Sequence, residues 1–128
     1  MYRVSFRKEL NLLDIKWLAM FEPERVGDYA RRLRDQFDAE GFAPGYLLRM
    51  DMRSSGVQAQ EAVFAFRRHF AGFPAARRIA IVTESAITRM QVRREMTQPY
   101  LRIFDRAEPA LSWLLQPDSE QDRRAEPG

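Results

Sequence analysis

The chain has 128 residues, no cysteine, a formal net charge of +3 and a hydrophobic fraction of 45%. This length fits one domain with its own core, the lack of thiols excludes disulfides, and no apolar run is long enough to span a membrane. Charged residues recur through the first thirty positions, so we expect no signal peptide and a cytoplasmic protein.

Two strands are expected at the start of the chain. Tyr2, Val4 and Phe6 alternate with polar residues, which is the period of a half-buried strand. A second strand is expected over Leu13–Phe21, which begins by alternating and ends continuously apolar. This change predicts an antiparallel edge hairpin that leads into the interior of a sheet. An exposed first strand also offers an edge for self-pairing, and we expect any homodimer to form there.

Alternating helices and strands are expected next. Pro23 suits a first helical position and Gly41 a helix end. Between them, one helical face collects Val26, Tyr29, Ala30, Leu33 and Phe37. Tyr46–Met52 is expected to form the third strand, and Arg78–Thr83, short and densely apolar, a central parallel strand.

A second helix is expected over residues 57–70. Its apolar stripe consists of Ala59, Ala62, Val63, Phe66 and Phe70. Phe64 lies off this stripe, where we expect it to contact a partner subunit or to close a pocket. A third helix is expected over Glu84–Met96, with a weaker stripe through Ile87 and Met90.

Leu101–Phe104 and Glu108–Leu115 complete the pattern as a last strand and a last helix. The order β-β-α-β-α-β-α-β-α predicts an α/β fold over residues 1–116, with four helices and a single mixed, mainly parallel five-stranded sheet. Residues 117–128 are polar and bounded by proline, and we expect this tail to be disordered.

This order resembles the STAS domains, the anti-sigma-factor antagonist family, and especially their sporulation protein AA-like (SpoIIAA-like) relatives. The resemblance rests on the initial hairpin, the four helices and the strand Arg78–Val82. It also rests on the closing strand Arg102–Phe104 and the helix Glu108–Leu114 with its acid, alanine and Trp-Leu pair. The resemblance covers nearly all of residues 1–116. It implies a non-enzymatic regulatory module that acts through protein–protein contacts at the turn between the third strand and the second helix.

In antagonist members of that family, a serine at the start of the second helix, preceded by an acid, is phosphorylated by a partner kinase. Ser54, Ser55 and Gly56 fall in that place, so the resemblance implies a phosphorylation or contact turn. Here Arg53 directly precedes the first serine, and Asp51 lies two residues further back, which departs from the family pattern.

The residues of this turn also have a simpler interpretation, which we favour. One of the two serines is expected to cap the second helix by accepting a hydrogen bond from its first N–H groups. A phosphate there would instead meet the positive end of the helix and change the charge of a contact surface. Asp51, at the end of a buried strand, is expected to accept N–H bonds of the turn or to shape the serine loop.

Catalysis and metal binding find little support in the sequence. The single histidine, His69, follows Ser55 by fourteen residues, about 20 Å along one helix, so the two cannot share a proton within that helix. One histidine, no cysteine and scattered carboxylates offer no metal-ligand spacing. We expect no enzymatic activity, no metal and no cofactor.

A second candidate surface follows the fourth strand. Arg89 and Arg93 lie one helical turn apart, and Met90, Met96 and Tyr100 interleave with them. The simpler interpretation is an amphipathic helix with solvated arginines. The functional interpretation is that the arginines hold an anionic group while the methionines and aromatic residues face an apolar ligand. No basic stripe or recognition motif indicates nucleic acid, which we rank lowest.

Two functions therefore stay open. The first is a regulatory module that binds another protein through the serine turn and the second helix. The second is a carrier or sensor of an apolar or amphiphilic, lipid-like ligand in a pocket between the sheet and the helix over 84–96. A filled interior with an exposed turn would favour the first, and a cavity walled by Met90, Met96 and aromatic residues the second.

Overall fold

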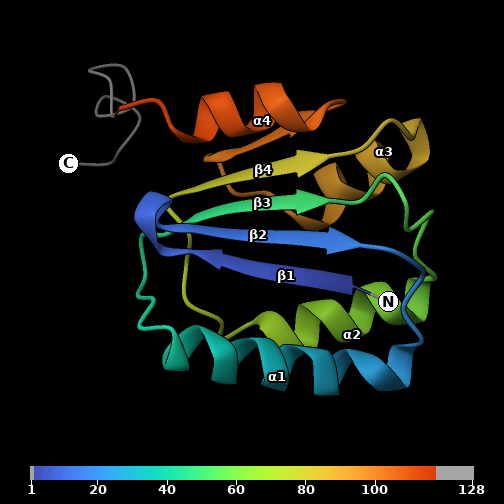
Figure 1. Ribbon diagram of the computed structural model, residues 1–128. Helices are drawn as coiled ribbons and strands as arrows, with labels where there is room; N and C mark the ends of the chain where they lie inside the picture. Colours follow the sequence, from blue (N-terminus) through green and yellow to red (C-terminus); the bar gives the residue numbers. More distant parts are fainter. Residues whose placement is uncertain (1, 118–128) are drawn as a thin grey trace.

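Residues 2–117 are described in a computed structural model of the chain (Figure 1). The five strands of its sheet lie in the order β1-β2-β3-β4-β5. They are β1 (Tyr2–Arg7), β2 (Leu12–Trp17), β3 (Leu47–Asp51), β4 (Arg78–Val82) and β5 (Leu101–Phe104). β1 is antiparallel to β2 and the other neighbouring pairs are parallel, which confirms the mixed, mainly parallel sheet. The tail predicted to be disordered lies outside the described residues from position 118 onward.

The helices of the described chain connect the strands in the predicted order. They are α1 (Val26–Ala39), α2 (Gln60–Phe70), α3 (Ala86–Glu95) and α4 (Ala107–Leu114), with short 3₁₀ turns at η1 (Lys8–Leu10) and η2 (Pro23–Arg25). α1 buries the face that its periodicity predicts. Gly41, at φ +76°, then turns the chain away from the helix in a conformation that favours glycine.

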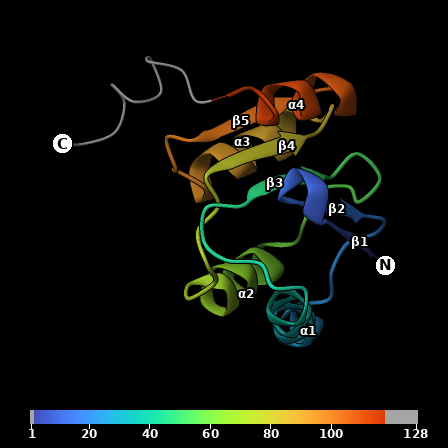
Figure 2. The same ribbon diagram turned by 60° about the vertical axis from the view of Figure 1, so that its left-hand side comes forward.

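Alternation along the strands gives the sheet two different faces. In β4, Ile79 and Ile81 join a core cluster with α1, α2 and Val92 of α3, whereas Ala80 and Val82 join a second cluster with α4. Figure 2 shows α1 and α2 on one side of the sheet and α4 on the other. The sheet is thus the middle layer of three.

The second strand is shorter than the predicted Leu13–Phe21. β2 ends at Trp17, and the chain then runs irregularly to η2. The N–H group of Phe21 donates to Oε1 of Gln58 at 2.9 Å instead of joining a sheet ladder. The Phe21 ring is buried against Trp17, with ring centres 5.0 Å apart. The apolar run after Trp17 therefore serves packing beyond the strand end.

The prediction for the buried face of α3 is wrong. Ile87 and Met90, its expected stripe, are 63% and 70% exposed, and Thr88 and Val92 are buried instead. Ser85 caps this helix, since its hydroxyl oxygen accepts the N–H of Thr88 at 3.1 Å. The side of α3 that faces the sheet borders a cavity, and Thr88, Gln91, Val92 and Glu95 line it, so this side is not a continuous apolar stripe.

Candidate functional site: a cavity between the sheet and helices α2 and α3

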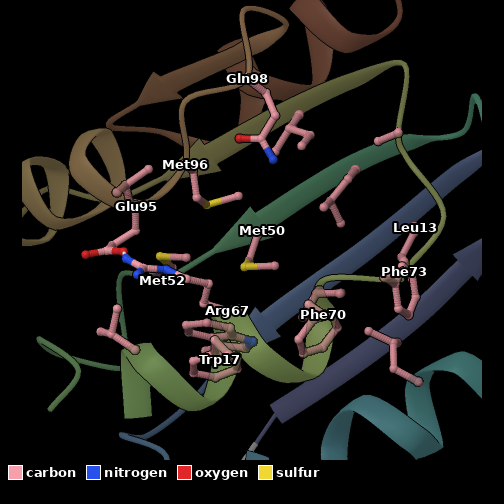
Figure 3. Close-up of a pocket in the computed structure, with 18 of the residues that line it drawn as sticks. Leu13, Trp17, Met50, Met52, Arg67, Phe70, Phe73, Glu95, Met96 and Gln98 are labelled. Carbon is pink, nitrogen blue, oxygen red and sulfur yellow. The ribbon is translucent and has the colours of Figure 1, made fainter. Parts of the chain in front are cut away.

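A cavity of about 430 Å³ lies between the first face of the sheet and the helices α2 and α3 (Figure 3). Small-molecule sites span about 300–1,000 Å³, so the cavity has the size of a ligand pocket. Its floor is apolar and comes from alternate residues of the strands, among them Met50 and Met52, the latter just beyond the end of β3. Thioether side chains such as these are flexible enough to adapt to differently shaped ligands.

The helices above the cavity are linked by polar contacts. Arg67 of α2 forms an ion pair with Glu95 of α3, and Figure 3 shows the two side chains pointing toward one another. Nε2 of Gln91 on α3 donates to the main-chain oxygen of Gln58, just before α2, at 3.0 Å. These contacts bridge α2 and α3 while leaving space below them, next to the sheet.

The ion pair lies at the edge of the cavity, with one side chain exposed to solvent and the other mostly buried. The Arg67 side chain is 62% exposed, whereas that of Glu95 is only 14% exposed. The guanidinium carbon of Arg67 also lies 5.8 Å from the ring centre of Phe64, which is exposed. Arg67 therefore lies at the rim of the cavity and neutralises a carboxylate that is mostly buried.

Aromatic side chains supply much of the remaining wall. Trp17 donates from Nε1 to the hydroxyl oxygen of Tyr29 at 3.2 Å, and Tyr46 donates its hydroxyl to the main-chain oxygen of Pro74 at 2.9 Å. Burial raises the pKa of both Tyr29 and Tyr46 well above the usual value of a phenol. Both hydroxyls therefore stay neutral at physiological pH.

Two amide groups of the wall have atoms without a hydrogen-bond partner in the described chain. These atoms are Nε2 of Gln58 and Oε1 of Gln98, and both are buried. Buried polar atoms in proteins nearly always have partners, so each such atom calls for an explanation. A ligand in the cavity would be one source of those partners.

Only some of the residues expected to contact a ligand line the cavity. Met96 and Tyr100 line the cavity. Arg89, Arg93 and Met90 are not among the residues that line it, and Met90 points to solvent because α3 presents its other face to the sheet. Phe64 also lies outside the lining.

The serine turn follows β3 at the edge of the cavity, where Ser55 and Gly56 belong to the lining and Asp51 and Ser54 do not. Asp51 is buried and accepts hydrogen bonds from the N–H of Arg53 at 3.0 Å and from its guanidinium at 2.7 and 3.0 Å. Burial by itself would raise the pKa of Asp51, but the bonds from Arg53 outweigh it, so the pKa is lowered. Asp51 thus fixes the position of Arg53, the first residue of the turn, through its hydrogen bonds.

The expected helix cap at this turn is wrong. α2 begins only at Gln60, and its N-cap residue, Ala59, has no side-chain cap bond. Ser55 is 3% exposed and donates its hydroxyl to the main-chain oxygen of Met52 at 3.0 Å, whereas Ser54 is exposed. Gly56, at φ +71°, turns the chain into an extended stretch that delays the helix.

Of the comparisons with known proteins, the one with solved structures finds a similar fold. No protein-family model matches the sequence, and no curated protein matches it. A solved structure from Shewanella loihica PV-4, described as an uncharacterized protein of the DUF3478 family with a SpoIIAA-like fold, superposes with a TM-score of 0.68. The match covers 89% of this chain and 92% of that one. This protein has a SpoIIAA-like fold.

The SpoIIAA-like fold confirms the fold that the sequence resemblance implied. At 15% identity the likeness shows the fold alone, so the site must be argued from this chain's own residues. In residues 2–117, no group of three or more histidine, aspartate or glutamate side chains is placed to hold a metal ion. No helix in the same range is long and apolar enough to cross a membrane.

The polar residues of the cavity wall were missed by the sequence reasoning. Neither Arg67 nor Glu95 is among the candidate residues that the sequence points to, because both belong to helices rich in charged side chains. A weak signal existed, because Gln91 and Glu95 lie one helical turn apart and accompany the buried Thr88 on the same side of α3.

Proposed function

We propose that the protein is a non-enzymatic binding module that takes up a small apolar or amphiphilic ligand in the cavity between the sheet, α2 and α3. The cavity itself supports the proposal most strongly. Protein interiors are packed like organic crystals, with few voids larger than a water molecule. A pocket of about 430 Å³ that is partly open to solvent and has a largely apolar wall is far larger than such a void.

The cavity's volume sets the size of the ligand. A dry apolar cavity of about 150 Å³ holds one benzene molecule, so the larger volume here has room for a ligand on the order of fifteen non-hydrogen atoms. An alkyl chain of about ten carbons or two fused or linked aromatic rings fits this range. Methionine and aromatic side chains of the wall supply the dispersion contacts.

Titration with N-phenyl-1-naphthylamine, an uncharged apolar fluorophore, tests the proposal. We expect saturable binding with an increase in emission as the fluorophore leaves water. Val92→Phe, which projects a larger side chain into the cavity, should weaken this binding at least tenfold. Ile87→Phe on the exposed side of the same helix should leave the affinity unchanged. Absence of saturable binding, or equal affinity in both variants, would contradict the proposal.

A second candidate function is docking of another protein at the turn formed by residues 53–56. Ser54 is exposed there, and an exposed methionine, Met20, lies beside Gly56. A polar hydroxyl next to an exposed apolar side chain suits a contact that phosphorylation would weaken. In a pull-down from the source organism, a partner should be lost with both Ser54→Glu and Met20→Ser and retained with Met90→Ser. Retention by all three variants would remove this candidate.

A further inference from the structure

We infer that the cavity selects a ligand whose polar group is uncharged, an alcohol or a primary amide rather than a carboxylate or an ammonium. The inference rests on the proposed function and concerns the same cavity. It follows from two unpaired amide atoms in the wall and from a charged pair that already neutralises itself.

The orientation of the Gln58 side chain is determined by its neighbours. Its Oε1 accepts the N–H of Phe21 at 2.9 Å, and its main-chain oxygen accepts from Gln91. The side-chain nitrogen is therefore left as a buried donor in the cavity wall, without a partner among residues 2–117. A buried donor without an acceptor is costly, and a ligand oxygen would relieve that cost.

Gln98 supplies the complementary group. Its main-chain oxygen accepts the N–H of Leu101 at 3.2 Å, which ties the segment to the start of β5. Figure 3 shows its side chain directed from this segment toward the cavity. The Oε1 atom is buried and has no partner in the described chain. A hydroxyl or a primary amide can both accept and donate, so either group can accept from the Gln58 nitrogen or donate to the Gln98 oxygen.

The charged residues of the wall disfavour an ionised ligand. Arg67 and Glu95 are the charged side chains that line the cavity in the described chain, and they pair with each other. A carboxylate on Arg67 would compete with Glu95, whose other ion pair, with the exposed Arg94, is longer at 3.5 Å. An ammonium on Glu95 would compete with Arg67 in the same way. Either ion weakens the pairing of a mostly buried carboxylate, whereas a neutral group leaves the Arg67–Glu95 pair intact.

A matched series of ten-carbon ligands tests the inference on the full chain. 1-Decanol, decanamide, decanoate and decylammonium would each displace N-phenyl-1-naphthylamine at pH 7. The alcohol and the amide should bind at least tenfold more tightly than the two ions. Decanoate or decylammonium binding as tightly as the alcohol would overturn the inference, while displacement as such would still support the proposed function. If the fluorophore itself does not bind, the proposed function fails and the inference fails with it.

Variants of the two amides separate hydrogen bonding from simple apolar fit. Gln98→Leu and Gln58→Glu should each weaken decanol and decanamide about 3- to 10-fold, the effect of one neutral hydrogen bond. Gln58→Glu keeps an oxygen to accept from Phe21. Gln36→Leu, the same kind of change on the exposed side of α1, serves as the control and should have no effect. Unchanged decanol affinity in both cavity variants would overturn the inference.

Discussion

The two faces of the sheet are packed in opposite ways. The face under α4 is a small cluster in which every core member is buried: Leu12, Leu47, Ala80, Val82, Ala110 and Leu114. None of these residues lines the cavity. The other face carries the larger side chains, with Trp17, Phe37 and Tyr29 in its core, and nevertheless borders a partly open cavity of about 430 Å³.

This difference shows that side-chain size does not determine how well a core is filled. On the α4 side, alanines in β4 and in the helix let the backbones approach closely. On the other side, α2 and α3 are bridged above the sheet by Arg67, Glu95 and Gln91. A close approach of helix and sheet fills a small core, whereas a polar bridge between neighbouring helices leaves room beneath it.

Truncation of a leucine on the filled side should give the largest effect. Leu114→Ala is expected to lower the free energy of unfolding by about 2–5 kcal/mol, because it creates a cavity in a packed core. Met96→Ala, at the wall of the existing cavity, should cost less than half as much, since its side chain already faces empty space. Urea denaturation measures both. Equal losses would show that the two faces are packed alike.

Enlargement of a valine to phenylalanine should destabilise the α4 side of the sheet more than the cavity side. Val82→Phe overfills the α4 side and is expected to cost about 1–3 kcal/mol. The same change at Val92 places the ring in the cavity, and we expect a change in stability within about 0.5 kcal/mol. Thermal or urea unfolding of the two variants provides the measurement. A strong destabilisation by Val92→Phe would mean that the cavity cannot accept added volume.

Removal of the Asp51 carboxylate should have a smaller, pH-dependent effect. The pKa of Asp51 is lowered in the folded state, so its contribution is fully present above the unfolded value of about 3.9 and is lost as the pH falls through the folded value. Asp51→Asn should cost about 1–2 kcal/mol at pH 7 and flatten the loss of stability below pH 4. Asp35→Asn, at an exposed position of α1, is the control. Parallel pH profiles for wild type and Asp51→Asn would rule out this role.

Substitution on the solvent side of α3 should have the smallest effect. Met90→Ser is expected to change the free energy of unfolding by no more than about 0.5 kcal/mol, because Met90 is 70% exposed. It should also leave fluorophore binding unchanged. A loss above 1 kcal/mol in chemical denaturation would indicate that Met90 is covered in solution, for example by a second subunit.

Much of the fold could be predicted because it depends on local patterns. Alternation marked β1, helical periodicity marked the buried face of α1, and the dense apolar run marked β4 as central. The parallel alignment of β3 and β4 followed from the helix between them. One error lay in the buried face of α3. The others lay at the end of β2 and the start of α2, where Gln58 forms long-range bonds to Phe21 and Gln91.

The candidate site was predictable only in part. Met96 and Tyr100 were named from an apolar pattern that also suggested Met90, which the structure places in solvent. The amides and the ion pair of the wall gave no pattern that could be distinguished from ordinary surface residues. Their partners lie on other elements, so their roles depend on distances that no local rule provides.

By itself, the sequence determined the order, type and direction of the strands and helices, because periodicity and short connections act over a few residues. Only the tertiary structure decided where space remains inside the protein. That outcome depends on how α2 and α3 sit above the sheet, and their separation is maintained by Arg67, Glu95 and the two glutamines at positions 58 and 91. Such a contact couples residues about thirty positions apart, and it becomes visible only when the helices are placed side by side.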